Sequence, residues 1–126
     1  MKKILLVDDL GIDLMLTRLA LEQVGPPYEI EVANDGSEAL EKIRQAQFDL
    51  MLLDIKMPRV DGFELLETLR EGAVAAPPVI ILSGSGLRTD RERAESLGAI
   101  EYVQKAVDYA SFQGELKASL KKHGFC

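Results

Sequence analysis

Residues 48–54 read Phe-Asp-Leu-Met-Leu-Leu-Asp, a short and nearly continuous apolar run that ends on a carboxylate. Such a run is typical of a strand that is covered on both faces, as in a parallel sheet. Two other runs share this character, Ile4–Val7 and Val79–Leu82, and each is followed directly by a polar residue. The sequence therefore predicts a buried parallel sheet whose strands end on polar side chains.

Strand-like runs and segments with helical spacing alternate along the whole chain. The first kind predicts strands over Ile4–Val7, Tyr28–Ala33, Phe48–Leu53, Val79–Leu82 and Glu101–Gln104. The second kind predicts helices over roughly Ile12–Val24, Ser37–Ala46, Gly62–Glu71, Asp90–Leu97 and Tyr109–Lys122. Asp61 and Thr89 each stand three residues before a glutamate, which indicates helix N-caps at these two positions. Five strand–helix repeats indicate a doubly wound α/β domain.

The size and charge of the chain limit what it can do. Its 126 residues fit one domain with one sizeable hydrophobic core. The formal net charge of −6 argues against general binding to nucleic acids or anionic membranes, because their phosphates would be repelled. The only cysteine, Cys126, cannot form a disulfide within the chain, which suits a reducing cytoplasm. We therefore expect one cytoplasmic domain over residues 1–126.

Polar residues follow four of the five predicted strands. Asp8 and Asp9 follow the first strand, Asp54 the third, Ser83 the fourth and Lys105 the fifth. Open parallel sheets bind ligands at the carboxyl ends of their strands, near the point where strand order reverses. If the first and third strands are neighbours, three carboxylates gather in one crevice, and the serine and the lysine line its other side.

Three carboxylates in one crevice need a cation or protons. Two of them at about 4 Å repel by roughly 4 kcal/mol at the effective dielectric of a protein surface. Oxygen ligands without a nearby histidine or cysteine favour Mg²⁺ over zinc. A carboxylate beside the metal can attack phosphorus, because the metal offsets the repulsion between the two anions. A lysine ammonium and a serine hydroxyl can each hold a phosphate oxygen.

Several motifs in order then carry a resemblance to a known family. They are the segment 52–62 around Asp54, the acidic pair at 8–9, the run Ile80-Ile81-Leu82-Ser83-Gly84, and Leu97-Gly98-Ala99 followed by Tyr102 and Lys105. Together they make the chain similar to the receiver domains of bacterial response regulators. The resemblance implies a five-stranded parallel sheet of order 2-1-3-4-5 between five helices, the flavodoxin-like arrangement.

The resemblance also implies a metal site and an acceptor. Asp54 would be the phosphoacceptor. Mg²⁺ would be bound by the carboxylates of Asp9 and Asp54 and by the backbone carbonyl of Lys56, with Asp8 acting through a water. Lys105 would hold the phosphoryl group.

A switch is implied by two further residues. Ser83 would move toward the phosphoryl group, and Tyr102 would rotate inward behind it, so that the population shifts between two states. The predicted fourth helix has only Ala94 and Leu97 as apolar anchors, so it should shift at low free-energy cost. The face made by the fourth helix, the fifth strand and the fifth helix would then change its binding to a downstream protein.

The implied function is a phosphorylation-dependent signalling switch of a two-component system. A histidine kinase or a histidine phosphotransfer protein would donate the phosphoryl group. The domain would catalyse only its own phosphorylation and dephosphorylation. We expect a monomer or a weak dimer in the cytoplasm, without membrane or nucleic-acid binding, and no output domain in this chain.

Four positions depart from the family's usual pattern or vary within it. Ala106 stands where proline normally follows the lysine in a cis bond; cis would cost roughly 3 kcal/mol before a non-proline residue, so a trans bond is favoured. That bond would place Lys105 differently or make the loop more mobile. Leu10 removes a polar neighbour from the acidic pocket. Lys56 and Ser85 are expected to tune the lifetime of the phosphoryl group.

Other functions remain open at this stage. A pseudo-receiver, which binds a partner without phosphorylation, is favoured by Ala106 and Leu10 and opposed by the intact acceptor site. A Mg²⁺-dependent phosphatase would need a general acid two residues after Asp54, where Lys56 stands. A flavin carrier is disfavoured because the acidic loop after the first strand would repel the flavin phosphate.

Overall fold

The computed structural model describes the chain except for residues 10, 56–61, 73–75, 85–86 and 106–107. Its strands are β1 (Lys2–Val7), β2 (Tyr28–Ala33), β3 (Leu50–Asp54), β4 (Val79–Ser83) and β5 (Glu101–Gln104). Its helices are α1 (Gly11–Val24), α2 (Gly36–Gln45), α3 (Gly62–Glu71), α4 (Arg88–Ser96) and α5 (Tyr109–Lys122). None of the helices in the described ranges combines the length and the apolar composition that a membrane span requires.

The five strands form one parallel sheet in the order β2-β1-β3-β4-β5, which confirms the expected fold. Strand β3 lies in the centre, and all five of its residues are buried. Leu52 of β3 is level with Leu6 of β1 on one side and with Ile80 of β4 on the other. The nearly continuous apolar run around Leu52 is therefore explained by burial on both faces of the sheet.

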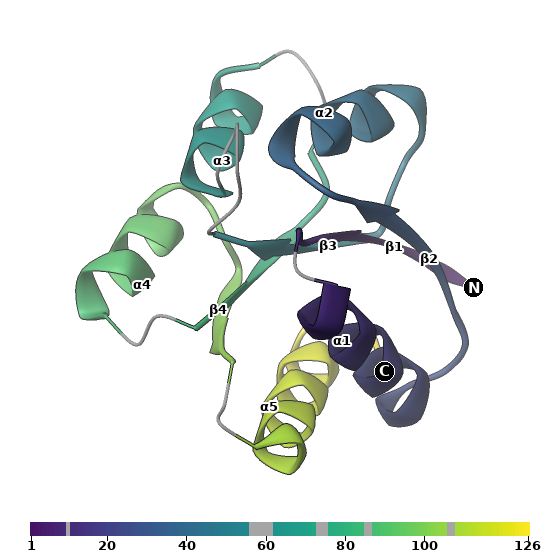
Figure 1. The fold of residues 1–126 in the computed structure, drawn as a ribbon. Coiled ribbons are helices and arrows are strands. Elements are labelled where there is room, and N and C mark those ends of the chain that lie inside the picture. The colour runs from purple at the N-terminus through teal and green to yellow at the C-terminus, as the bar shows by residue number, and fades with distance from the viewer. Residues whose placement is uncertain (10, 56–61, 73–75, 85–86, 106–107) are drawn as a thin grey trace.

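Two helical layers cover the two faces of the sheet (Figure 1). Because side chains alternate along a strand, Met51 and Leu53 point to the side of α2, α3 and α4, and Leu50 and Leu52 point to the side of α1 and α5. All four are fully buried. Each such side chain contributes about 1.5–3 kcal/mol by leaving water, so β3 is held firmly in the middle of the molecule.

Where the structure describes the residue before a helix, side-chain caps start α2 and α5. Asp35 accepts a hydrogen bond from the backbone N–H of Glu38 at 2.8 Å, and Asp108 accepts one from Ser111 at 2.8 Å. The prediction that Thr89 caps the fourth helix is wrong. The cap is Leu87, whose side chain makes no capping bond. The predicted cap at Asp61 lies outside the described residues.

The earlier start of α4 has a local cause. Arg88 lies in the first turn and pairs with Glu92 one turn further on, with 2.8 Å between Nε and Oε1. Such an i,i+4 pair favours helical structure at both of its residues. Thr89 therefore lies inside the first turn of α4 and does not cap the helix. The other predicted boundaries differ from the observed ones by two residues or fewer.

Gly62 allows α3 to begin directly against the end of β3. A β-carbon at this position would lie 2.6 Å from the Cα atom of Ile55 and 2.7 Å from the carbonyl oxygen of Asp54. The Gly62 backbone N–H also donates to the carbonyl of Ile55 at 2.7 Å. The backbone around Asp54 is thus held between the sheet and the first turn of α3.

Candidate functional site

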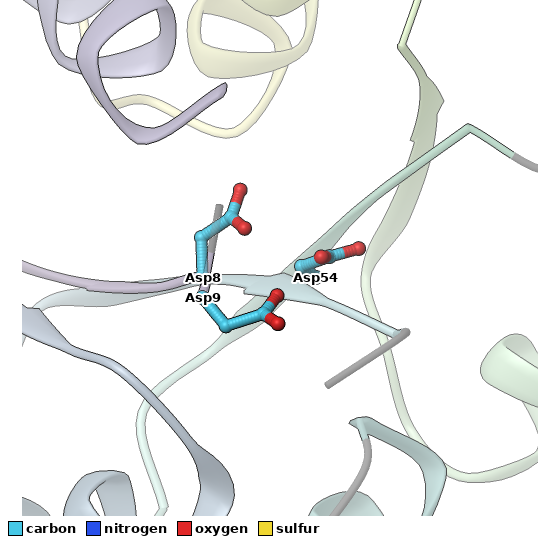
Figure 2. Close-up of side chains that lie close together, drawn as sticks. All are labelled: Asp8, Asp9 and Asp54. Carbon is cyan, nitrogen blue, oxygen red and sulfur yellow. The ribbon is translucent and has the colours of Figure 1, made fainter. Parts of the chain in front are cut away.

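Three carboxylates meet at the carboxyl edge of the sheet. Asp8 and Asp9 directly follow β1, and Asp54 is the last residue of β3, the strand beside β1. Their carboxylate oxygens lie within 4.8 Å of one another. Figure 2 shows the side chain of Asp9 extending toward Asp54, while that of Asp8 is turned toward the side of α1 and α5.

The three acids differ in their access to solvent. Asp8 is 2% exposed and Asp54 is 6% exposed, whereas Asp9 is exposed. Carboxylates at this spacing repel one another by several kcal/mol in a partly buried setting, about 4 kcal/mol for each pair at 4 Å. The cluster therefore favours a cation that reaches it from the open side at Asp9.

Lys105 supplies a positive charge on the other side of the cluster. Its Nζ atom lies 3.0 Å from Oδ2 of Asp8, 3.2 Å from Oδ2 of Asp13 and 3.8 Å from Oδ1 of Asp54. Burial of the ammonium lowers its pKa, but the charges of Asp54 and Asp8 and the hydrogen bonds from the lysine to Asp8 and Asp13 outweigh this and hold the pKa above its ordinary value. Lys105 is therefore charged at neutral pH and available to hold an anion beside Asp54.

Ser83 lies on β4, the strand beside that of Asp54, and Tyr102 lies on β5, one strand further out. Ser83 ends β4, one residue beyond the level of Asp54, and it is buried. Its carbonyl accepts a hydrogen bond from the backbone N–H of Lys105 at 2.6 Å, which joins the ends of β4 and β5. The ring of Tyr102 on β5 is buried, and the guanidinium of Arg91 on α4 lies 4.9 Å from its centre.

The structure therefore brings Asp8, Asp9, Asp54 and Lys105 together as predicted. Four positions discussed from the sequence, Leu10, Lys56, Ser85 and Ala106, lie outside the described residues.

Asp13 is a contact of the lysine that sequence reasoning missed. It lies in the first turn of α1, where an acidic residue is ordinary, so the sequence alone carries no signal for its contact with Lys105.

The chemistry of the donors fits a hard divalent cation. Asp8, Asp9 and Asp54 offer only carboxylate oxygens, and their mutual spacing allows one ion to contact more than one of them. Mg²⁺ binds to one or two carboxylates and keeps several waters, which leaves room for phosphate oxygens. The site thus combines three clustered carboxylates, whose oxygens suit a divalent cation, with a nearby ammonium group.

Comparison with known proteins identifies the family. The family of response regulator receiver domains matches residues 4–117. This chain belongs to that family. Receiver domains accept a phosphoryl group and act as signalling switches in two-component systems, and they bind Mg²⁺ at an acidic pocket.

Individual relatives agree with this assignment. The receiver domain is 37% identical over 125 residues to the transcriptional regulatory protein CpxR homolog of Haemophilus influenzae, covering 97% of this chain and 52% of that protein. It is 33% identical over 121 residues to the alkaline phosphatase synthesis transcriptional regulatory protein PhoP of Bacillus subtilis, covering 96% of this chain and 49% of that protein. The chain thus spans about half the length of these curated relatives.

A solved structure agrees as well. The phosphorylated cyanobacterial phytochrome response regulator RcpA has 30% sequence identity to this receiver domain and a TM-score of 0.84, covering 95% of this chain and 91% of that chain. The similarity therefore extends over the whole arrangement of sheet and helices.

Mg²⁺ is expected to stabilise this receiver domain against unfolding. A ligand that binds only the folded state at about 100 times its Kd adds roughly 2.7 kcal/mol to the free energy of unfolding. Thermal denaturation with Mg²⁺ and with a chelator would measure the gain in Tm. Asp9→Asn should reduce this gain, whereas Glu22→Gln, on the exposed surface of α1, should leave it unchanged. Equal gains in both variants would contradict a metal site at Asp9.

Proposed function

We propose that Asp54 is the phosphoacceptor of this receiver domain. The observation that carries the proposal is the position of its carboxylate, which lies within the cluster of Asp8 and Asp9 and 3.8 Å from the ammonium of Lys105. Mg²⁺ would be bound by Asp9, Asp54 and the backbone carbonyl of Lys56, with Asp8 acting through a water. In this arrangement the nucleophile has a metal on one side and a fixed positive charge on the other.

The transfer needs one bond to form and one to break. An oxygen of Asp54 forms a bond to phosphorus, and the bond between phosphorus and the donor's histidine nitrogen breaks. Its electron pair stays on the imidazole, which then takes a proton from water. When bound, Mg²⁺ would neutralise part of the negative charge on the phosphoryl oxygens. Lys105 donates an N–H to one phosphoryl oxygen, and the Ser83 hydroxyl donates to another.

The same site would control the face formed by α4, β5 and α5. Ser83 is joined to Lys105 by a backbone hydrogen bond, and Tyr102 lies on β5 under Arg91 of α4. Among the described residues of α4, only Ala94 is buried, so the helix can move at low cost. A shift of Ser83 toward the phosphoryl group would change the packing behind Tyr102 and hence the surface that a downstream protein binds.

A protein donor also needs a place to dock. Helix α1 exposes Ile12, Met15, Leu16 and Leu19 at helical spacing, and the same helix carries Asp13, which contacts Lys105. Exposed apolar stripes of this kind mark protein-binding surfaces. A histidine kinase or histidine phosphotransfer protein in the cytoplasm would bind there and bring its phosphohistidine to Asp54.

The static pseudo-receiver is not favoured. A domain without phosphorylation has no need for three clustered carboxylates beside a charged lysine, because that arrangement costs free energy without a metal. The relatives include a phosphorylated regulator, RcpA. The domain would act as an enzyme only on itself, in its own phosphorylation and dephosphorylation.

Mass spectrometry of the intact protein tests the proposal. The protein is incubated with acetyl phosphate and Mg²⁺, and a parallel sample contains a chelator. We expect a gain of one phosphoryl group only when Mg²⁺ is present. Reduction with borohydride converts an acyl phosphate to homoserine, and peptide mapping should place it at residue 54. Folded protein with no gain, or homoserine at another residue, would refute the assignment.

A further inference from the structure

Asp13 contacts the site's lysine but is not part of the carboxylate cluster. Its Oδ2 atom accepts a hydrogen bond from Nζ of Lys105 at 3.2 Å, while the three clustered acids are Asp8, Asp9 and Asp54. The pair joins the first turn of α1 to the residue after β5, across 92 positions of sequence. The side chain of Lys105 is 17% exposed and that of Asp13 is 36% exposed, so this ion pair is more protected than an ordinary surface pair.

The two other carboxylates near the lysine, those of Asp8 and Asp54, would also interact with the metal or the phosphoryl group. Phosphorylation would move the negative charge of Asp54 from its carboxylate outward onto the phosphoryl oxygens, and Asp8 would turn part of its charge toward Mg²⁺. Both changes alter where the attraction acts on the ammonium of Lys105, and the metal itself repels the ammonium. Asp13 contacts the lysine without belonging to the cluster, so its attraction persists in each of these states.

Geometry also limits where the ammonium can go. An ammonium has three N–H donors, and here two of them have carboxylate acceptors, Asp8 at 3.0 Å and Asp13 at 3.2 Å. These two bonds leave Nζ at 3.8 Å from Asp54, close enough for the third donor to reach a phosphoryl oxygen on that residue. Without Asp13, the lysine side chain would populate more rotamers, and its ammonium would lie beside Asp54 for a smaller fraction of the time.

We propose that Asp13 is a positioning residue for phosphoryl transfer, which holds the ammonium of Lys105 beside Asp54 when metal and phosphoryl group are bound. The role rests on the proposed function of Asp54. It gives α1 a part in positioning the lysine of the site, in addition to its place in the core.

The rate of phosphorylation by acetyl phosphate at saturating Mg²⁺ tests this role. Asp13→Asn keeps the shape of the side chain and removes its charge, and it should slow the reaction by about threefold to fivefold, the range expected for loss of one partly exposed ion pair. Asp13→Glu should restore part of the rate. Glu22→Gln removes an acid from the same helix, where it contacts Arg18 and not the site, and should react at the wild-type rate.

A second background shows whether Asp13 acts through the lysine. In a protein that already carries Lys105→Met, Asp13→Asn should have no further effect on the rate. An equal slowing in both backgrounds, or an unchanged rate in the wild-type background, would overturn the role of Asp13 while leaving Asp54 as the acceptor. A wild-type protein that gains no phosphoryl group would refute both the proposed function and this role.

Discussion

Asp54→Asn is expected to abolish the gain of a phosphoryl group from acetyl phosphate. The amide keeps the size of the carboxylate and can still offer an oxygen to Mg²⁺, but it is not a nucleophile for phosphorus. Because Asp54 is the strand-end carboxylate that lies both in the cluster and beside Lys105, no other described side chain has the same position to replace it. Intact mass measured over time should show no phosphorylated species in the variant.

The same variant should be more stable than wild type when Mg²⁺ is absent. Removal of one carboxylate relieves repulsion from Asp8 and Asp9, which we expect to exceed the lost attraction to Lys105 and to add about 1–2 kcal/mol to the free energy of unfolding. Urea denaturation in a chelator would measure this.

A control variant for Asp54→Asn can be made in the same segment, residues 48–54. Asp49→Asn changes an exposed acid just before β3, at the opposite end of the strand from the site. It should retain phosphorylation and show no gain in stability. A phosphorylated Asp54→Asn protein would contradict the assignment of the acceptor.

Lys105→Met is expected to slow phosphorylation on the order of 100-fold, the effect of removing one fixed donor to developing negative charge. Methionine retains much of the apolar stem and removes the ammonium that lies 3.0 Å from Asp8 and 3.8 Å from Asp54. The affinity for Mg²⁺ should change in the opposite direction, since a cation no longer competes for these carboxylates. Rates from mass spectrometry and metal titration by calorimetry would measure the two effects.

The opposite signs separate a role in chemistry from simple damage to the fold. A distorted site would lose both phosphorylation and metal binding. Lys117→Met, an exposed position on α5, is the matched control and should leave both quantities unchanged. If Lys105→Met phosphorylates at the wild-type rate, the ammonium has no part in holding the phosphoryl group.

Strand-end positions made most of the site predictable from the sequence. Asp54 follows an apolar run that can be read directly as a buried strand, and parallel strands bring their ends to one edge of a sheet. The prediction that β1 lies next to β3, so that Asp8 and Asp9 lie beside Asp54, came from the family resemblance. Hydrophobic patterns alone do not specify the order of strands in a sheet. The structure confirms that neighbour and the full order of the sheet.

The contacts that the sequence did not reveal depend on tertiary placement. Asp13 resembles any acid in the first turn of a helix, where such residues are favoured by the helix dipole. Only the packing of α1 beside the end of β5, which brings Asp13 within 3.2 Å of Lys105, turns it into a partner of the lysine. Thr89 failed as a predicted cap for a similar reason, since a pair formed inside α4 extended the helix past it.

The unequal exposure of Asp8, Asp9 and Asp54 indicates the order in which a cation and a phosphate would bind to the cluster. Asp9 is exposed, so an ion in solution can reach the cluster there, whereas Asp8 is buried. An approaching phosphate carries the same sign of charge as the empty cluster and would be turned away until a cation is in place. The domain would then be loaded in sequence, cation first and phosphate second, by the sign of its own charges.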